Sequence, residues 1–315
     1  MIALDEIRAA ADRIGGRLHR TPLVRQTLIG ERAGVELWVK CELFQKTGSF
    51  KPRGALHKVL SLGEAERARG LVTVSAGNHA AAVAWAAREV GAPAVVVMPE
   101  DAPRSKLDAV RGYGAEVVLH ADRATLFDRL REVERARGLT FVHPFDDPAV
   151  LAGAGTVGLE IAEDLQDLDV VVVPVGGGGL LGGVASALRA LSPRTRIVAV
   201  ELASCPGLAP ALAAGAPVTV ARDRTTIADG LTPPFVGALP LAIARAAGVE
   251  VVAVTDEAIV DAMRALMTRG KLYVEGSGAA ATAAVLAGAA PRGTRVVAIA
   301  SGGNIDPARA FTVLG

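Results

Sequence analysis

The sequence predicts an α/β protein with two open units, each built around a mostly parallel sheet. Three observations predict this fold class. Short Val-rich runs alternate with stretches of helical periodicity, each run is apolar throughout, and the runs fall into two sets near residues 70–143 and 169–301. Strands that are apolar on both faces are typical of parallel sheets covered by helices on both sides. A chain of 315 residues is also long enough for about two domains.

The first set of elements follows an N-terminal helix, which the amphipathic pattern of residues 1–14 predicts. Each later element is predicted from an apolar run or from apolar residues at helical spacing. In chain order the first set comprises a strand at 70–77, a helix at 78–91, a strand at 92–99, a helix at 103–114, a strand at 115–120, a helix at 124–138 and a strand at 140–144.

The second set repeats the alternation after a linking segment. Residues 144–153, "PFDDPAVLAG", are predicted to form a loop between the two units, because Pro and Asp favour turns. In chain order the second set comprises a strand at 169–175, a helix at 179–192, strands at 196–201 and 250–256, a helix at 261–270, an Ala-rich helix near 277–289 and a strand at 295–303.

Composition excludes several classes of function. The formal net charge is +1, only 3% of residues are aromatic and no basic patch is evident, so we expect no nucleic-acid partner. The apolar runs are far shorter than the roughly 18 residues that cross a bilayer. With no visible signal peptide, we expect a cytoplasmic protein without a membrane partner. Cys41 and Cys205 have neither metal-ligand spacing nor a disulfide framework.

A run of four glycines, Gly176–Gly179, stands between a predicted strand and a predicted helix. The N–H groups of such a loop converge on a phosphate, and the helix dipole adds positive potential. Residues 177–182, "GGGLLG", also match the dinucleotide fingerprint, with Glu201 at the spacing of a ribose-binding acid. An NAD(P)-dependent oxidoreductase that uses Gly177–Gly182 and Glu201 is therefore one alternative. A second match at 153–158, "GAGTVG", follows no predicted strand.

Lysine is scarce in this chain, and four of its six lysines lie between residues 40 and 58. Lys51 stands in "KTGSFKPRGA", directly after Phe50. A Lys here, in a chain that otherwise uses Arg, indicates an amine that must lose its proton, which Arg cannot do. A neutral Lys can form an imine with an aldehyde. Lys51 and the glycine loop would then hold the two ends of pyridoxal 5'-phosphate. The dinucleotide alternative, by contrast, leaves the first half of the chain without a role.

Four motifs occur in the order found in one family: "KTGSFKPRGA" (46–55), "SAGNHAAAVA" (75–84), "VGGGGLLGG" (175–183) and "ASGGNID" (300–306). In these motifs the chain resembles the serine/threonine dehydratases and the related serine racemases. These enzymes form the second fold type of pyridoxal-phosphate enzymes. The resemblance runs from "HRTPL" at residue 19 to "GGNID" and covers nearly the whole chain.

The resemblance implies a tryptophan synthase β-like architecture. A large cofactor-binding domain is expected at 1–59 and 149–315, and a small mobile domain at 60–148. The cofactor is expected in the cleft between them. The family also implies a homodimer.

The resemblance assigns a role to each motif residue. Lys51 would bond to the cofactor aldehyde and then move protons at Cα, with Phe50 stacked on the pyridine. The remaining cofactor contacts would be Asn78 at the ring 3-oxygen, Ser301 at the pyridine nitrogen, Gly230 on the ring side opposite Phe50, and a phosphate cradle of Gly176, Gly177, Gly178, Gly179 and Leu180. The substrate carboxylate would lie in the loop formed by Ser75, Ala76, Gly77, Asn78 and His79.

The sequence departs from the family pattern at two sites. Racemases of the family use a Ser directly before the Gly of the Asn loop, where this chain has Ala76. A methyl group carries no proton, so we predict elimination rather than racemisation. Some relatives bind a divalent cation near Glu201, but Gly207 replaces the second acid, so we predict no metal site. The chain ends at Gly315, soon after the last motif, and we expect no regulatory domain.

The sequence therefore predicts a pyridoxal-phosphate-dependent dehydratase (ammonia-lyase). It would remove the β-hydroxyl of L-threonine, L-serine or a related 3-hydroxy amino acid, giving a 2-oxo acid and ammonia. The oxidoreductase above and a non-catalytic relative that binds pyridoxal phosphate are the alternatives. The predicted partner is a small amino-acid substrate.

Overall fold

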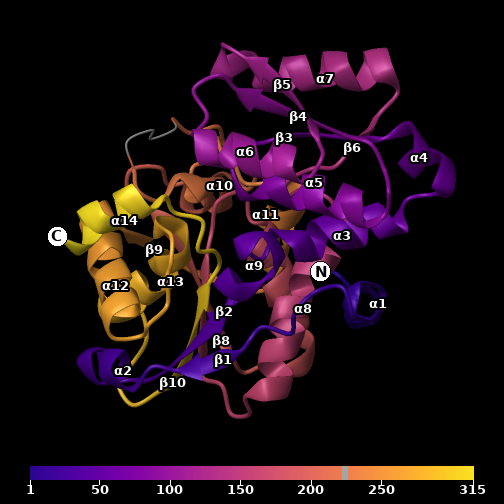
Figure 1. Cartoon of the computed structure of the whole chain (residues 1–315). Helices are drawn as coiled ribbons and strands as arrows, with labels where there is room; N and C mark the ends of the chain where they lie inside the picture. Colours follow the sequence, from indigo (N-terminus) through magenta and orange to yellow (C-terminus); the bar gives the residue numbers. More distant parts are fainter. Residues whose placement is uncertain (222–225) are drawn as a thin grey trace.

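The computed structural model describes residues 1–221 and 226–315, which form two sheets with helices on both faces of each (Figure 1). The larger sheet has the strand order β1-β2-β10-β7-β8-β9, and only β1 and β2 are antiparallel neighbours within it. Its strands are β1 (Leu23–Arg25), β2 (Glu36–Cys41), β7 (Val170–Pro174), β8 (Arg196–Leu202), β9 (Glu250–Val254) and β10 (Arg295–Ala300).

Strand β7 shows why the Val-rich runs are apolar throughout. Val170 and Val172 join the core on one face of the large sheet, whereas Val171 and Val173 join the core on the other face. Both faces are covered by helices, so neither set of side chains meets solvent. The prediction of parallel sheets covered on both sides is confirmed.

The smaller sheet is parallel throughout and has the strand order β5-β4-β3-β6. Helix α7 packs on one face, and helices α3, α5 and α6 pack on the other. In Figure 1 this sheet lies at the top of the molecule, above the large sheet. Its strands are β3 (Leu71–Val74), β4 (Ala94–Pro99), β5 (Glu116–His120) and β6 (Thr140–Phe141).

The helices agree with most of the predicted elements. Helix α1 begins the chain, as its amphipathic pattern predicted. In the described residues the α-helices are α1 (Leu4–Ile14), α2 (Thr27–Ala33), α3 (Lys51–Ser61), α4 (Glu64–Arg69), α5 (Asn78–Glu89), α6 (Arg104–Gly112), α7 (Leu126–Arg137), α8 (Pro148–Asp164), α9 (Gly179–Leu191), α10 (Leu208–Ala214), α11 (Ala238–Ala246), α12 (Asp256–Thr268), α13 (Gly276–Leu286) and α14 (Pro307–Leu314). The short 3₁₀ turns are η1 (Glu42–Phe44), η2 (Lys46–Gly48), η3 (Arg123–Thr125) and η4 (Asp229–Leu231).

The loop predicted at 144–153 is wrong in its second half, because helix α8 begins at Pro148. The Asp147 carboxylate accepts from the N–H groups of Ala149 (2.8 Å) and Val150 (3.1 Å), and Pro occupies the first helical position. Asp and Pro in this order start a helix as readily as they form a turn. The glycine match at 153–158 lies inside this helix.

The predicted motifs gather at one edge of the sheets. Strands β3, β7 and β10 end immediately before the loops that carry Ser75, Gly176 and Ser301. Parallel strands present their carboxyl ends at a common edge, which is where α/β proteins place their ligands. Among the described residues, no helix combines the length and apolarity needed to cross a bilayer.

Candidate active site

Several of the predicted site residues are joined in one circuit of contacts at the carboxyl ends of β7 and β10. The N–H of Phe50 donates to the carbonyl of Ser301 (3.0 Å), and the Ser301 hydroxyl donates to the carbonyl of Ser277 (3.4 Å). The Ser277 hydroxyl accepts from the N–H of Gly230 (3.0 Å). The carbonyl of Gly230 in turn lies against Gly176, at 2.8 Å from the place of a Cβ.

The circuit closes through residues 142–146, which we call the crossing loop because they lead from β6 towards α8. The ring of Phe145 packs on Gly177 so closely that a Cβ there would lie 2.2 Å from the ring. The preceding residue, Pro144, accepts a hydrogen bond of 2.8 Å from the Lys51 amine through its carbonyl. The structure thus brings Lys51, Phe50, Gly230, Ser301 and the glycine loop around one site.

Lys51 is the first residue of α3, and its amine has no carboxylate partner among the described residues. The amine lies 5.1 Å from the centroid of the Phe50 ring. Burial lowers the pKa of Lys51 to about 8, because the site removes water from the ammonium without supplying a counter-charge. A sizeable fraction of the amine is therefore neutral near physiological pH, as a nucleophile or a general base requires.

The glycine loop presents unpartnered donors. No carbonyl of the described residues accepts from the N–H groups of residues 176–181, which run into the first turn of α9. Gly178 has φ +91°, a conformation that favours glycine. Buried N–H groups need an acceptor, and a helix N-terminus attracts anions. The loop therefore fits a phosphate group.

Glu275 is a residue of the site that sequence reasoning missed. Its carboxylate accepts 2.7 Å from the amide of Asn78, whose oxygen accepts 2.8 Å from the amide of Asn304. Burial first, and then the charge of the nearby Asp229, raise the pKa of Glu275 to about 7. The Asn78 amide keeps one more N–H for a ligand oxygen. The only signal in the sequence was an acid directly before the apolar helix "GSGAAA".

Two neutral imidazoles flank Lys51. His79 is buried and shares a hydrogen bond with the carbonyl of Val142 (3.1 Å). Burial, and then the charge of Lys51, lower the pKa of His79 well below its usual value. In His143, Nδ1 accepts from the N–H groups of Phe145 (3.2 Å) and Asp146 (2.8 Å), and burial lowers its pKa too. Both rings are therefore uncharged at neutral pH.

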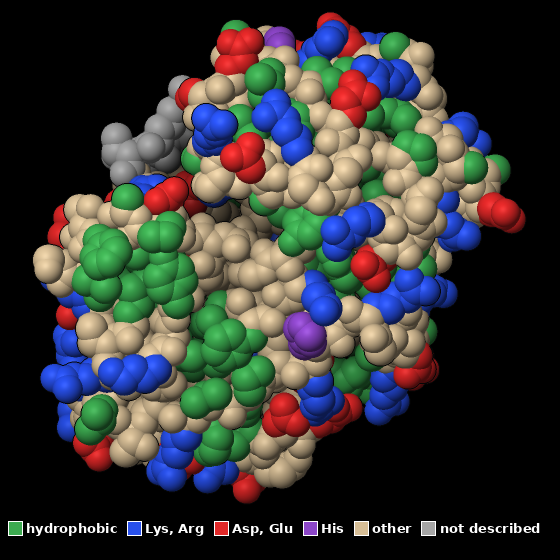
Figure 2. Space-filling view, viewed as in Figure 1, with side chains coloured by type: hydrophobic (Ala, Val, Ile, Leu, Met, Phe, Trp, Pro, Cys, Tyr) green, Lys and Arg blue, Asp and Glu red, His purple; other side chains and the backbone are tan. Residues whose placement is uncertain are grey.

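The loop that the sequence assigns to a substrate carboxylate follows β3. The Ser75 hydroxyl accepts from the N–H of Gly77 (3.1 Å), and Ala76 presents a methyl group to the smaller core. The amine of Lys106, from α6, lies 3.7 Å from the place of a Cβ on Gly77. Lys106 also pairs with Asp229 at 2.5 Å, so one ion pair joins the two sheets' regions beside this loop. Figure 2 shows the face hollowed between these regions.

The carboxylate of Glu201 binds backbone N–H groups. Its carboxylate accepts from the N–H groups of Leu208 (2.6 Å) and Ala209 (3.4 Å), and burial raises its pKa. These contacts take the place of the ribose contact that the dinucleotide alternative requires. Within the described residues, no three His, Cys, Asp or Glu side chains are grouped to hold a metal ion.

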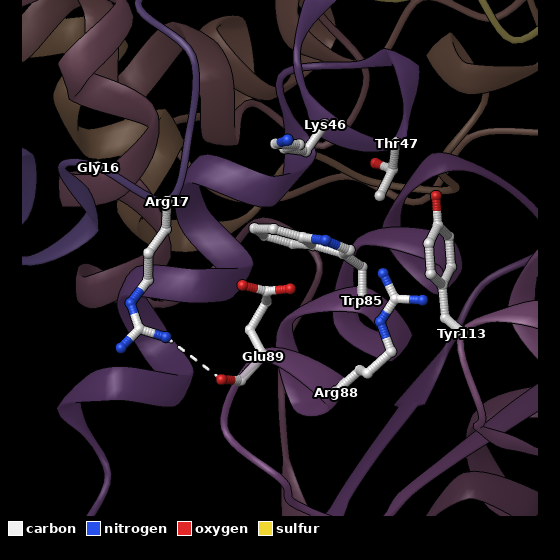
Figure 3. A pocket seen from close by; sticks show the side chains of 8 residues that line it. All are labelled: Gly16, Arg17, Lys46, Thr47, Trp85, Arg88, Glu89 and Tyr113. Atoms are coloured by element: carbon white, nitrogen blue, oxygen red, sulfur yellow. Dashed lines mark hydrogen bonds between the residues drawn. The ribbon is translucent and has the colours of Figure 1, made fainter.

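A cavity of about 450 Å³ lies beside the site but excludes Lys51. Figure 3 shows Trp85 and Lys46 at its wall and the Arg88 guanidinium over the Tyr113 ring, 4.9 Å from its centroid. Arg17 donates to the carbonyl of Glu89 (3.2 Å) at its edge. None of the residues that line this cavity is a predicted site residue.

Comparison with known proteins gives consistent matches. The profile of the family described as "Pyridoxal-phosphate dependent enzyme" matches residues 15–302. An "L-threonine ammonia-lyase" of Thermotoga maritima is 43% identical over 97% of this chain and 76% of that protein. "L-threonine dehydratase catabolic TdcB" of Escherichia coli is 41% identical over 100% of this chain and 96% of that protein. The structure of maize serine racemase has a TM-score of 0.93 at 38% identity, covering 99% and 97% of the two chains.

Proposed function

The chain belongs to the family of pyridoxal-phosphate-dependent enzymes, and on that premise we propose that it is a dehydratase (ammonia-lyase) for L-threonine or L-serine. The substrate would lose its Cα proton and its β-hydroxyl as water. The enamine that leaves the enzyme would take up water again, so the net products are a 2-oxo acid and ammonium. The names of the similar lyase and dehydratase, each aligned over nearly all of this chain, support the proposal.

The residues present fit the cofactor. The unpartnered N–H groups of 176–181 suit its phosphate, and the Lys51 amine suits its aldehyde. Phe50 and Gly230 would face the ring from opposite sides, and Ser301 would meet its nitrogen. Bound pyridoxal phosphate supplies an aldehyde for the substrate amine and a ring that spreads negative charge from Cα.

The Lys51 amine is the observation that carries the proposal. Held by the Pro144 carbonyl and lowered in pKa to about 8, it can take the Cα proton at neutral pH. We assign the substrate carboxylate to residues 75–79, close to the charge of Lys106. Asn78 would hold the ring oxygen, with Glu275 and Asn304 fixing its amide. The Ser301 hydroxyl is neutral and would leave the ring nitrogen without a firm proton, which favours prompt elimination.

Racemisation is the second candidate, because the maize racemase is structurally similar. It requires a group that returns a proton to the face of Cα opposite Lys51. Ala76 places a methyl at the position that the racemases fill with Ser, so we expect elimination to exceed racemisation. Chiral analysis of the serine that remains after incubation with L-serine measures both rates in one sample: D-serine reports racemisation, and the loss of total serine reports elimination.

The decisive experiment measures 2-oxo acid and ammonia released from L-threonine and L-serine by the purified chain with pyridoxal phosphate. We expect turnover and a yellow absorbance that borohydride bleaches. Lys51→Ala should lose both, whereas Lys58→Ala, on the same helix, should keep both. A wild-type protein that is yellow but inactive on every hydroxy amino acid would be the non-catalytic relative.

We further infer a homodimer in the cytoplasm, with residues 60–148 as a mobile small domain. The large side chains of Phe311, Tyr273 and Phe44 are exposed, and Figure 2 shows apolar side chains gathered on the face near α14. Such a surface suits a second copy. The unpaired thiols of Cys41 and Cys205 suit a reducing compartment. Sedimentation that gives the mass of one chain would exclude the dimer.

A further inference from the structure

Helix α3 has two functional sides at its first turn. Lys51 points to the crossing loop, where it meets Pro144. Arg53 stands two residues later, and two residues on an α-helix are separated by about 200° of rotation. Arg53 therefore points away from the site, into the protein behind the helix, where only 2% of its surface is exposed.

Behind the helix, Arg53 is clamped between two carboxylates. Its Nε and Nη2 donate to Glu42 at 2.7 and 2.8 Å, and its Nη1 and Nη2 donate to Glu160 at 2.7 and 2.9 Å. A fifth bond of 3.0 Å runs from Nη1 to the hydroxyl of Thr156. Lys40, fully buried, donates to Glu160 at 2.6 Å, so two cations balance two anions. We call Lys40, Glu42, Arg53 and Glu160 the rear cluster.

The distance of helix α3 from helix α8 is fixed independently of the Arg53 contacts. A Cβ on Gly54 would lie 2.7 Å from the carbonyl of Val150, and a Cβ on Gly153 would lie 2.3 Å from the carbonyl of Arg53. The backbones of α3 and α8 are thus in direct contact. Close contact sets the distance between the two helices, and His57 (2.9 Å to the Ala149 carbonyl) and Lys58 (2.6 Å to Asp147) bind the later turns of α3 to the start of α8. The rigid fork of Arg53, bound to η1 and to α8 together, fixes the first turn, which carries Lys51.

We propose that Arg53 is a positioning residue for the Lys51 amine, acting through the rotation of α3 that its fork between Glu42 and Glu160 enforces. This inference rests on the proposed function, because it concerns the amine that performs it. Only Pro52 separates Lys51 from Arg53, so both residues lie in the first turn of α3. Rotation of the first turn would therefore move the amine from the Pro144 carbonyl towards the open side of the site.

Two variants test the proposal without leaving a buried charge unpaired. The double variant Arg53→Met/Glu42→Gln removes one cation and one anion, and replacing a buried pair in this way commonly preserves stability. Arg53→Lys keeps the charge but cannot bind both carboxylates with a planar fork. Arg20→Met is the control, because Arg20 also binds two carboxylates of α8, Glu163 and Asp164, but at the surface.

The first readout needs no cofactor: acylation of Lys51 in the full chain across pH, followed by mass spectrometry, gives the apparent pKa of its amine. Both test variants should raise it by about one unit, towards the ordinary Lys value. With cofactor, kcat should fall about 10–100-fold at nearly constant KM, because misplaced catalytic groups cost rate rather than binding. The Arg20 control should change neither quantity.

The proposal is overturned if either test variant melts like the wild type and retains the wild-type Lys51 midpoint and kcat. Failure of the proposed function looks different. A wild-type chain without the yellow absorbance or turnover would remove the enzymatic role, while the acylation midpoints would still report whether Arg53 positions the amine.

Discussion

Lys40 is fully buried and Lys51 is partly buried, and the partners of their amines differ in kind. The Lys40 amine meets a carboxylate of Glu160 at 2.6 Å and a carbonyl of Thr21 at 2.7 Å. The Lys51 amine meets the Pro144 carbonyl, and no carboxylate of the described residues pairs with it. A buried ammonium with a counter-charge is a structural element, whereas one without is poised to lose its proton.

The same contrast separates the two sides of α3. The rear cluster contains two cations and two anions in mutual contact, and its members are almost fully buried. The front holds Lys51 with its lowered pKa and Glu275 with its raised pKa. We expect the paired charges to make the helix rigid and the shifted pKa values to make the site reactive. Three measurements can break or sharpen this comparison.

The largest effect is expected from unbalancing the rear cluster. Glu42→Gln would leave Arg53 with one carboxylate too few, and an uncompensated buried charge costs about 3–5 kcal/mol of unfolding free energy. Urea denaturation measures the loss. Glu163→Gln is the matched control, because its pair with Arg20 is half exposed and worth less than about 1 kcal/mol. Equal losses in both variants would contradict the distinction.

The next largest effect is expected from Glu275→Gln, which should change how the unfolding free energy depends on pH. The folded pKa is about 7 against an ordinary 4.5, so the folded state holds this proton more firmly than the unfolded state. Stability should therefore fall between about pH 4.5 and 7, by about 3 kcal/mol from this group. The variant should lack that fall in its unfolding free energy.

The control for Glu275 is a surface carboxylate. The hydrogen bond and ion pair with Arg196 lower the pKa of Glu250. The contribution of Glu250 to the unfolding free energy therefore changes only in more acid solution. Glu250→Gln should leave the slope between pH 5 and 8 unchanged. An identical slope in the wild type and in Glu275→Gln would show that Glu275 does not titrate in that window.

The smallest expected effect is the difference in acylation rate between Lys51 and Lys40. At pH 8 about half of an amine with a pKa of 8 is neutral, roughly 100 times the neutral fraction of an ordinary Lys. Acylation of the cofactor-free chain should modify Lys51 first and leave Lys40 unmodified until the protein unfolds. Quantitative mass spectrometry of the two peptides measures both rates. Equal rates would place both amines in equivalent surroundings.

The sequence predicted the front of the site far better than the rear. Lys51, the glycine loop and the Ser301 turn follow strand ends, where short motifs carry a recognisable spacing, and the structure places them together. Arg53 and Glu160 are 107 residues apart, and no local pattern indicates that two such side chains will pair. Helix α8 was missed for a related reason: Asp147 and Pro148 suit both a turn and a helix start, and only packing on α3 decides between them.

Glu275 shows the limit most clearly. Its position before an apolar helix was visible, but the shift in its pKa arises from burial and from Asp229, 46 residues earlier in the chain. Asn78 was predicted to meet a ring oxygen directly. In the structure its amide is held by Glu275 and Asn304, so its orientation depends on residues more than 190 positions later in the chain.

Phe145 and Gly177 have a consequence for how this site can evolve. A glycine-rich loop is usually explained by its ligand, but the aromatic ring already occupies the space that any larger residue at 177 would need. The two positions are therefore epistatic: Gly177 can change only after Phe145 has become smaller. The protein's own packing thus imposes glycine at 177 before any ligand arrives.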